Sequence, residues 1–463
     1  MVLESLDLVN RAIEEALKLG AEYADIRFEE VVSTQILVRR GYVESSGVNF
    51  VRGLGTRVLV NGSWGFSSTN EITRESVLEA IKNAVKLAKT SSPARSRRVK
   101  LADIKTYKDH VVAKVNIKLT DVPIEEKVKE VLEADKVLRS HSPLIKDTRI
   151  FYNDQIFSKI FVSSEGASIV IEGCRIYARF YANAEESGVL SPAYETIGGV
   201  KGFEILKKGE HLEVAKKVAE RSVKLLKARV PKGGVFTVVL DNRLLALIVH
   251  EAFGHTAEGD LVLTGTVLTN KVGEKIVSEL VTIVDDPEPK NANGWTPYDD
   301  EGVKARKVVI VENGILKEYM QSRETAAALG MKPTGNARAQ SYAYPPIVRM
   351  RNTYMLPRDW KPEEIIEETK EGYYLKGAMG GQADANGEFM FSVQEAWRIE
   401  NGELKEPYKG VTVSGNALKV LSTVNAVAND LIIGFPGTCG KFQLVPVDGG
   451  GPHIRCKIRI GGR

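Results

Sequence analysis

The sequence contains little cysteine and little histidine. The first shortage excludes a disulfide-rich protein, and the second makes the position of each histidine informative. Its 463 residues include three cysteines and six histidines. Three cysteines cannot form a disulfide framework and suit a reducing compartment. Two of the six histidines, His250 and His255, nevertheless stand close together. Such a pair in a histidine-poor chain indicates a functional site within residues 241–260.

Long apolar runs and a strong charge of either sign are also missing. No run of about 18 apolar residues is present, as a membrane-spanning helix would need. The first residues lack the positive segment and apolar core of a signal peptide. The net charge is only +4, which gives little reason to expect nucleic acid as a direct ligand. We therefore expect a cytoplasmic protein that binds neither a membrane nor nucleic acid directly.

The length and the turn-forming residues indicate how the chain is divided. A chain of 463 residues is long enough for two or three domains. Residues 229–234 form a proline- and glycine-containing loop between a charged helical segment and an apolar strand, which is typical of a boundary. We predict an N-terminal α/β region over 1–230 and a C-terminal domain over 231–463. A further boundary within the first region is expected near 91–104.

Hydrophobic periodicity predicts an α+β protein. In the N-terminal region, apolar residues at helical spacing predict four helices near 4–19, 73–90, 123–139 and 211–228. Alternating segments between them predict antiparallel strands, with a hairpin turn at Asn61-Gly62. Beyond residue 260 the pattern is mostly strand and turn, including further Asn-Gly pairs. The C-terminal domain is therefore expected to be mostly antiparallel sheet around one buried helix.

That buried helix ends in the motif His250-Glu251-x-x-x-His255. Two imidazoles beside a carboxylate are what a zinc hydrolase needs, as two neutral ligands and a general base. The alternative is a core histidine with a satisfied partner beside a surface glutamate. Histidines five apart lie roughly 140° apart around a regular α-helix and would not converge on one ion. A π-helical turn would bring them onto one face, so we predict a distorted helix over 250–255.

A third ligand has to come from elsewhere in the chain. Cys439 lies in the glycine-rich segment 434–441, where a thiolate can approach a metal closely. Cys174 and Cys456 each share the apolar side of a strand and are expected in a core. His453 is the rival third ligand, or a substrate-binding group. Two histidines, a cysteine and a water would make an open site, as in catalytic zinc centres.

Three consecutive acids, Asp299, Asp300 and Glu301, leave two interpretations open. They are either acids that support the site from behind its ligands, or an acidic turn.

The sequence closely resembles the TldD branch of the TldD/PmbA metallopeptidases over nearly its whole length. The resemblance is carried by motifs that occur in a fixed order, namely His250-Glu-Ala-Phe-Gly-His255, Asp299-Asp-Glu-Gly302, Pro333-Thr-Gly-Asn336, Asn352-Thr-Tyr-Met355, Gly380-Gly-Gln382, Cys439-Gly-Lys441 and Val445-Pro-Val447. One position departs from the pattern. Phe442 follows Cys-Gly-Lys, where a glycine or a charged residue was expected.

The resemblance implies roles for particular residues. It implies one zinc ion per chain, bound by His250, His255 and Cys439, with Glu251 as the catalytic base. It also implies peptide and unfolded or small-protein substrates, and a dimer with a second copy or with a TldE/PmbA-like chain. An extended substrate could be bound by strand addition with low sequence specificity. The alternative is a non-catalytic peptide-binding or regulatory partner whose metal is structural.

Overall fold

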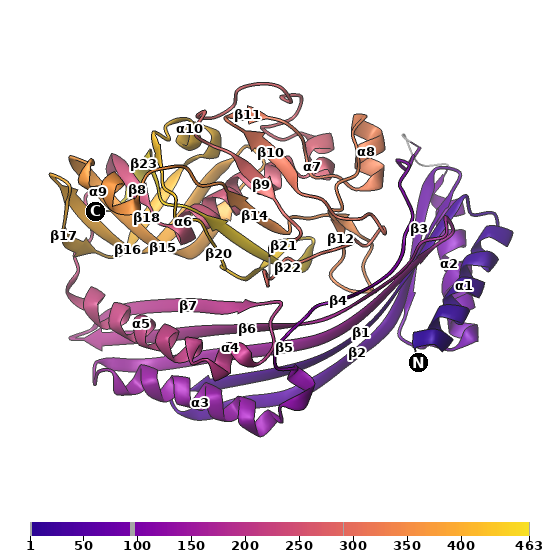
Figure 1. Cartoon of the computed structure of the whole chain (residues 1–463), viewed down its shortest axis with the longest axis horizontal. Coiled ribbons are helices and arrows are strands. Elements are labelled where there is room, and N and C mark those ends of the chain that lie inside the picture. Colours follow the sequence, from indigo (N-terminus) through magenta and orange to yellow (C-terminus); the bar gives the residue numbers. More distant parts are fainter. Residues whose placement is uncertain (1, 93–97, 290, 463) are drawn as a thin grey trace.

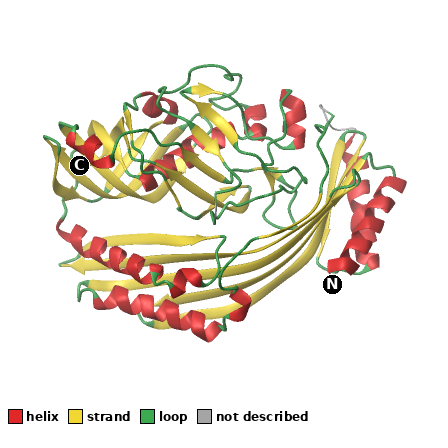
Figure 2. Ribbon diagram, in the orientation of Figure 1, coloured by secondary structure: helices red, strands yellow, loops and turns green. Residues whose placement is uncertain are grey.

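The computed structural model describes residues 2–92, 98–289 and 291–462. Part of the loop at 91–104, where a further boundary was predicted, lies outside the described residues. The chain forms two bodies of structure, one on each side of the loop at 229–234 (Figure 1). Sheets dominate both bodies and most strand pairs are antiparallel, which confirms the predicted α+β class (Figure 2). Among the described helices, none is long and apolar enough to cross a membrane.

The N-terminal half is built on one curved sheet with very long strands. Its strands are, in order across the sheet, β3 (Ser63–Thr69), β2 (Tyr42–Val60), β1 (Tyr23–Arg39), β5 (Ile145–Ser163), β6 (Ser168–Glu186) and β4 (Lys108–Val112), with β7 (Val189–Gly199) also pairing with β6. Among the described strand pairs of this sheet, only β4–β6 is parallel. At about 3.4 Å per residue, a 19-residue strand such as β6 reaches far beyond one small core.

Helices cover the outer face of this sheet in two groups, and the inner face turns toward the C-terminal half (Figure 1). The helices are α1 (Val2–Lys18) and α2 (Arg74–Ser91) at one end, and α3 (Ile124–Ser140), α4 (Glu204–Lys207) and α5 (Glu210–Lys224) at the other. The sheet therefore carries two separate apolar cores. All four predicted helices are confirmed.

Helix α2 illustrates how local sequence sets these elements. The side chain of Thr73 caps its first turn by accepting a hydrogen bond from the backbone N–H of Ser76. Apolar residues at helical spacing form its buried face, namely Val77, Ala80, Ile81, Ala84, Val85 and Ala88. The hairpin turn at Asn61-Gly62 is also present, with φ of 50° and 69°. Positive φ at both positions is what a type I′ turn requires.

The C-terminal half contains two larger sheets that enclose one helix. The first sheet comprises β15 (Glu371–Ala383), β8 (Gly234–Leu240), β23 (Ile454–Gly461), β18 (Val411–Asn416), β16 (Glu388–Glu400) and β17 (Glu403–Tyr408), with β19 (Ala426–Val427) beside β23. The second comprises β11 (Ile315–Leu316), β10 (Val308–Glu312), β9 (Ile283–Asp285), β14 (Asn352–Met355), β22 (Gln443–Gly451) and β20 (Ile432–Ile433), with β21 (Gly437–Lys441) beside β22.

Short elements complete this half. They are α6 (Asn242–Leu247), α7 (Gly259–Thr264), α8 (Arg323–Leu329), α9 (Pro362–Glu367), α10 (Ala417–Ser422), and the strand pair β12 (Ala337–Arg338) and β13 (Ile347–Val348). Helix α6 continues into the motif. Its Leu244 and Leu245 are fully buried in the largest apolar core of the described residues, and Leu247 packs partly buried against that core. The buried helix predicted from its apolar surroundings is thus confirmed.

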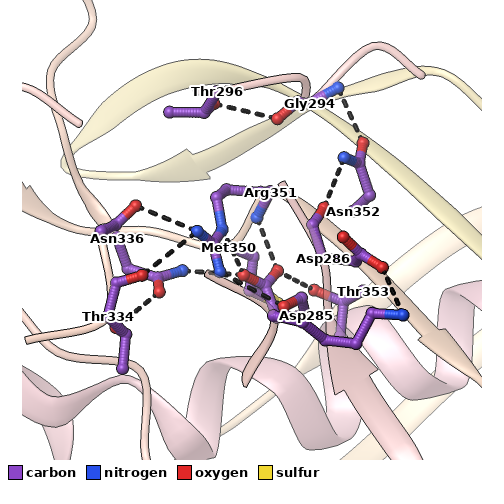
Figure 3. Close-up of polar contacts among 12 residues, drawn as sticks. Asp285, Asp286, Gly294, Thr296, Thr334, Asn336, Met350, Arg351, Asn352 and Thr353 are labelled. Atoms are coloured by element: carbon purple, nitrogen blue, oxygen red, sulfur yellow. Dashed lines mark hydrogen bonds and ion pairs between the residues drawn. The ribbon is translucent and has the colours of Figure 1, made fainter. Parts of the chain in front are cut away.

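A buried ion pair ties the second sheet together (Figure 3). Asp285 and Arg351 are both fully buried, and Nε of Arg351 lies 2.7 Å from Oδ2 of Asp285. The same carboxylate accepts hydrogen bonds from the backbone N–H of Arg351, from Nδ2 of Asn336 and from the hydroxyl of Thr353. A buried charge with this many partners is stable, but each partner depends on the others.

The ion pair makes a prediction about stability. Arg351→Met leaves the Asp285 carboxylate buried without its cation, so we expect unfolding to become easier by about 3–5 kcal/mol. The measurement is the denaturant midpoint of the purified variants. Arg398→Gln is the matched control, because it breaks an exposed pair with Glu371 and should cost about 1 kcal/mol or less. Equal midpoints for the two variants would contradict the prediction.

Candidate metal centre

The motif helix begins at a cap that also anchors it to a neighbouring strand. Asp241 accepts a hydrogen bond from the N–H of Leu244 at 2.8 Å and so caps the first turn of α6. Its second oxygen accepts from the N–H of Gly377 at 2.9 Å, in β15. The position of the helix along the sheet is therefore fixed at its first turn.

The helix then changes its winding where the sequence predicted a distortion. Residues Ile248–Phe253 form a π-helical turn, η4, followed by a 3₁₀ turn at Gly254–Ala257. The wider turn brings positions five apart closer to one face, as the spacing of the two histidines requires. Gly254 is needed at this point because a Cβ there would lie 2.2 Å from Sδ of Met350. The predicted distortion is confirmed.

The structure brings His250, His255 and Cys439 together. One possible ligand atom from each of the three lies within 4.8 Å of the others. Nε2 of His255 is 3.2 Å from Sγ of Cys439, and the two imidazole rings are 5.5 Å apart, nearly perpendicular. Nε2 of His250 is buried and has no hydrogen-bond partner. A buried nitrogen without a partner is costly, and a metal ion between these three side chains would satisfy it.

The protonation of Cys439 also fits a metal ligand. Burial by itself raises the pKa of this thiol, but the adjacent His250 and His255 outweigh burial and lower the pKa to about 5. The thiolate is the form of cysteine that binds metals. Two nitrogens and one sulfur are a donor set that zinc accepts, and it leaves one of the four usual positions open.

A second carboxylate, Glu258, supports His255 and is absent from the sequence-based site. Its Oε2 lies 2.8 Å from Nδ1 of His255, and the side chain is fully buried. Burial raises the pKa of Glu258, but His255 and Lys441 outweigh it and lower the pKa to about 2. A carboxylate that accepts from Nδ1 fixes the ring so that Nε2 faces Cys439. The spacing of three residues after His255 is the only signal in the sequence.

Cys439 is held by a segment that is distant in the sequence. It lies in β21, which forms a hairpin with β22. The fully buried guanidinium of Arg349 donates to the carbonyl oxygens of Cys439 at 2.8 Å and of Gln443 at 2.7 Å. The hairpin turns at Phe442, which has φ of 57° and is 92% exposed. The unexpected residue after Cys-Gly-Lys therefore lies at the hairpin tip, pointing into solvent.

Glu251 lies beside the ligand cluster and is accessible. Its carboxylate oxygens are 3.7 Å from Nε2 of His255 and 4.0 Å from Nε2 of His250. His250, Glu251 and Cys439 all line one cavity of about 380 Å³. A half-exposed carboxylate at this distance can reach a small molecule bound at the cluster without itself being a ligand.

The remaining candidates lie in other surroundings. His453 forms hydrogen bonds through both ring nitrogens, with Asp430 at 2.7 Å and with the hydroxyl of Tyr374 at 3.0 Å. It is outside the ligand cluster found among the described residues. Cys174 and Cys456 are buried in apolar cores, as predicted. Burial raises the pKa of Cys456 to about 12.

The three consecutive acids join the two halves of the chain. Asp300 pairs with Lys159 of β5 at 2.6 Å, and Glu301 pairs with Arg57 of β2 at 2.9 Å. Asp299 instead accepts hydrogen bonds from backbone N–H groups within its own turn. The acids thus form a turn whose side chains hold the curved sheet against the C-terminal half.

Comparison with known proteins places the chain in a family. Residues 24–88, 117–226 and 233–462 match models described as PmbA/TldA metallopeptidase domain 1, central domain and C-terminal domain. A metalloprotease of Methanocaldococcus jannaschii is 41% identical over 96% of this chain and 97% of its own length. A zinc metalloprotease TldD homolog of Saccharolobus solfataricus is 36% identical over 97% of this chain and 99% of its own.

A solved structure shares the whole fold. TldE from Thermococcus kodakarensis superposes with a TM-score of 0.82, covering 98% of this chain and 100% of that one, at 20% identity. The sequence matches extend across both halves of the chain. Identities of 41% and 36% over nearly the full length show common ancestry. The chain therefore belongs to the PmbA/TldD family of metallopeptidases.

Proposed function

We propose that this chain is a zinc-dependent peptidase with one ion per chain, bound by His250, His255 and Cys439, and with Glu251 as its general base. The observation that carries the proposal is the convergence of three ligand atoms within 4.8 Å at the wall of an accessible cavity. The described residues offer three ligands there, whereas structural zinc is usually enclosed by four. This count favours catalysis over a purely structural metal.

The chemistry divides between the metal and the chain. Zinc bound at this position would act as a Lewis acid on the scissile carbonyl and make a water molecule more acidic. Glu251 accepts the proton of the attacking water and delivers it to the leaving amine. Glu258 keeps His255 in the ring orientation that points Nε2 toward Cys439. The surrounding apolar core excludes other water from behind the ligands.

We propose that peptides and unfolded or small proteins are the substrates, bound as extended strands with low sequence specificity. Two strands at the cavity support this. Residues of β15 line it at Met379 and Gly380, where the pairing with β16 is interrupted. Residues of β21 line it at Gly437 and Thr438, and this strand pairs with β22 on one side. Backbone groups of a peptide added to a strand edge bind independently of sequence.

We also propose a dimer, with a second copy or with a TldE-like chain. The support is the free edge of β2, because β3 pairs with this strand only from Leu54 onward. Before that point β2 exposes large apolar side chains, namely Tyr42 at 77%, Val48 at 59% and Phe50 at 64%. An exposed apolar strand edge is a ready surface for pairing with another chain.

The general base gives the first prediction about function. Glu251→Gln should retain zinc and the fold but lower peptide cleavage by roughly a hundredfold or more, since the carboxylate no longer accepts a proton. The measurement is hydrolysis of an unfolded protein substrate, together with the zinc content of the same preparation. Glu279→Gln makes the same change at an exposed position and should be fully active. Full activity of the Glu251 variant would remove the proposed base.

The contact between Glu258 and His255 gives a second prediction. Glu258→Gln should weaken zinc binding by about 10- to 100-fold, because the imidazole loses its charged partner. Competition with a chromophoric chelator measures the affinity. Cys439→Ser, which removes a proposed ligand, should weaken it further. If both variants bind zinc as the parent does, the zinc ion is not bound by His255 and Cys439.

The free edge of β2 gives a third prediction about function. The double substitution Val48→Lys and Phe50→Lys should convert a dimer into a monomer, because charged side chains on an edge strand oppose pairing. Light scattering of the double variant measures the mass, with Met390→Lys as the control at another exposed apolar position. A parent dimer that the double variant leaves intact would exclude this edge as the interface.

A further inference from the structure

The cavity at the metal-ligand cluster continues along the inner face of the curved sheet. Three adjoining cavities, of about 380, 680 and 630 Å³, are all lined by Tyr177 of β6. The first and the third also share Arg179. They share these lining residues and together form one path, called the cleft below. Its first two parts lie between the sheet and the C-terminal half, and its third part is lined by residues of the sheet alone. A peptide whose scissile bond lies at the cluster would extend into it.

Arg179 is placed at the junction of two parts of the cleft. Side chains alternate along β6, so Arg175, Tyr177 and Arg179 share the inner face, while Phe180 packs in the outer core. The guanidinium carbon of Arg179 lies 4.4 Å from the centroid of the Tyr194 ring on β7. Stacking on an aromatic ring holds a guanidinium in place while leaving its N–H groups at the edge free to donate.

The charge of Arg179 is not neutralised by the protein. The side chain is exposed, and no carboxylate within the described part of the chain lies at ion-pair distance from it. The other arginine of the first cavity, Arg243, is already bound to Glu195 and Thr196. Arg175 donates to the backbone carbonyls of Asn293 and Trp295. Among the described arginines that line the cleft next to the cluster, Arg179 is thus the one whose guanidinium N–H groups remain available to a ligand.

The neighbouring charges do not cancel it. Each carboxylate oxygen of Glu195 already pairs with an arginine, Oε1 with Arg221 and Oε2 with Arg243. Farther along, Arg149 also lines the cleft. Asp147, which lines the same part, already pairs with Arg39 and Arg40. The path leading away from the cluster therefore attracts negative charge.

We infer that Arg179 is a specificity-determining residue that binds a carboxylate of the substrate peptide in the cleft. The carboxylate is either an acidic side chain or the C-terminus of the peptide, because both present the same planar pair of oxygens to a guanidinium fork. This inference rests on the proposed peptidase function. It adds a charge preference to a site whose strand edges are otherwise indifferent to sequence.

The experiment compares matched peptides on matched variants. One set of peptides carries a single Glu or Gln moved along a neutral sequence, and each peptide is made with a free and an amidated C-terminus. The parent should cleave the carboxylate-bearing member of some pair about tenfold faster in kcat/KM, as expected for a hydrogen-bonded charge pair. Arg179→Gln should abolish this ratio, and Arg179→Glu should transfer the preference to lysine-containing peptides.

The controls separate this inference from the proposed function. Arg74→Gln removes the same charge at the exposed first turn of α2 and should leave the ratio unchanged. Loss of the Glu/Gln ratio identifies a side-chain carboxylate, and loss of the free/amidated ratio identifies the C-terminus. An unchanged ratio in Arg179→Gln, or an equal decrease for neutral amidated peptides, overturns the inference. If the parent cleaves nothing, the proposed function fails, and dissociation constants of the same peptides still decide the role of Arg179.

Discussion

The buried charge at Asp285 is the constraint on which the ligand cluster depends. It fixes Arg351 through a side-chain ion pair and a backbone hydrogen bond. The two residues before Arg351 then reach the cluster from one side. Arg349 holds the carbonyl of Cys439, and the N–H of Met350 donates to Glu258 at 3.3 Å. Because Glu258 in turn orients His255, one short segment positions two of the three ligands.

This arrangement explains how ligands from distant parts of the chain are held in fixed positions relative to one another. The histidines belong to a helix that is buried on nearly all sides. The cysteine belongs to a hairpin whose Val445 and Val447 pack into the same apolar core, and the guanidinium of Arg349 fixes the backbone at Cys439. Lys441 adds a second attachment, through ion pairs with Glu258 and Asp260. Buried charges thus do the positioning, and the apolar core supplies the stability.

Local patterns in the sequence predicted much of the fold. The apolar spacing of α2, the Asn-Gly turns and the π-helical turn at Ile248–Phe253 all follow from neighbouring residues, and the structure confirms them. His250, His255 and Cys439 were brought together on chemical grounds and by resemblance. The contacts of Arg349 with Cys439 and of Glu258 with Lys441 were not predicted, because buried polar contacts between distant segments leave no periodic signal. The acids at 299–301 were open to two interpretations for the same reason, since the cations that pair with Asp300 and Glu301 lie more than 100 residues away.

The π-helical turn has a consequence for how such sites are recognised across protein families. In a regular helix, two ligands on one face are four residues apart. Here the wider turn absorbs one additional residue, so the count along the chain changes while the two imidazoles still converge. A motif defined by counting intervening residues treats the two cases as unrelated. A motif defined by the direction in which the two imidazoles face groups the two cases together. The local winding of the backbone is then part of what identifies such a metal site.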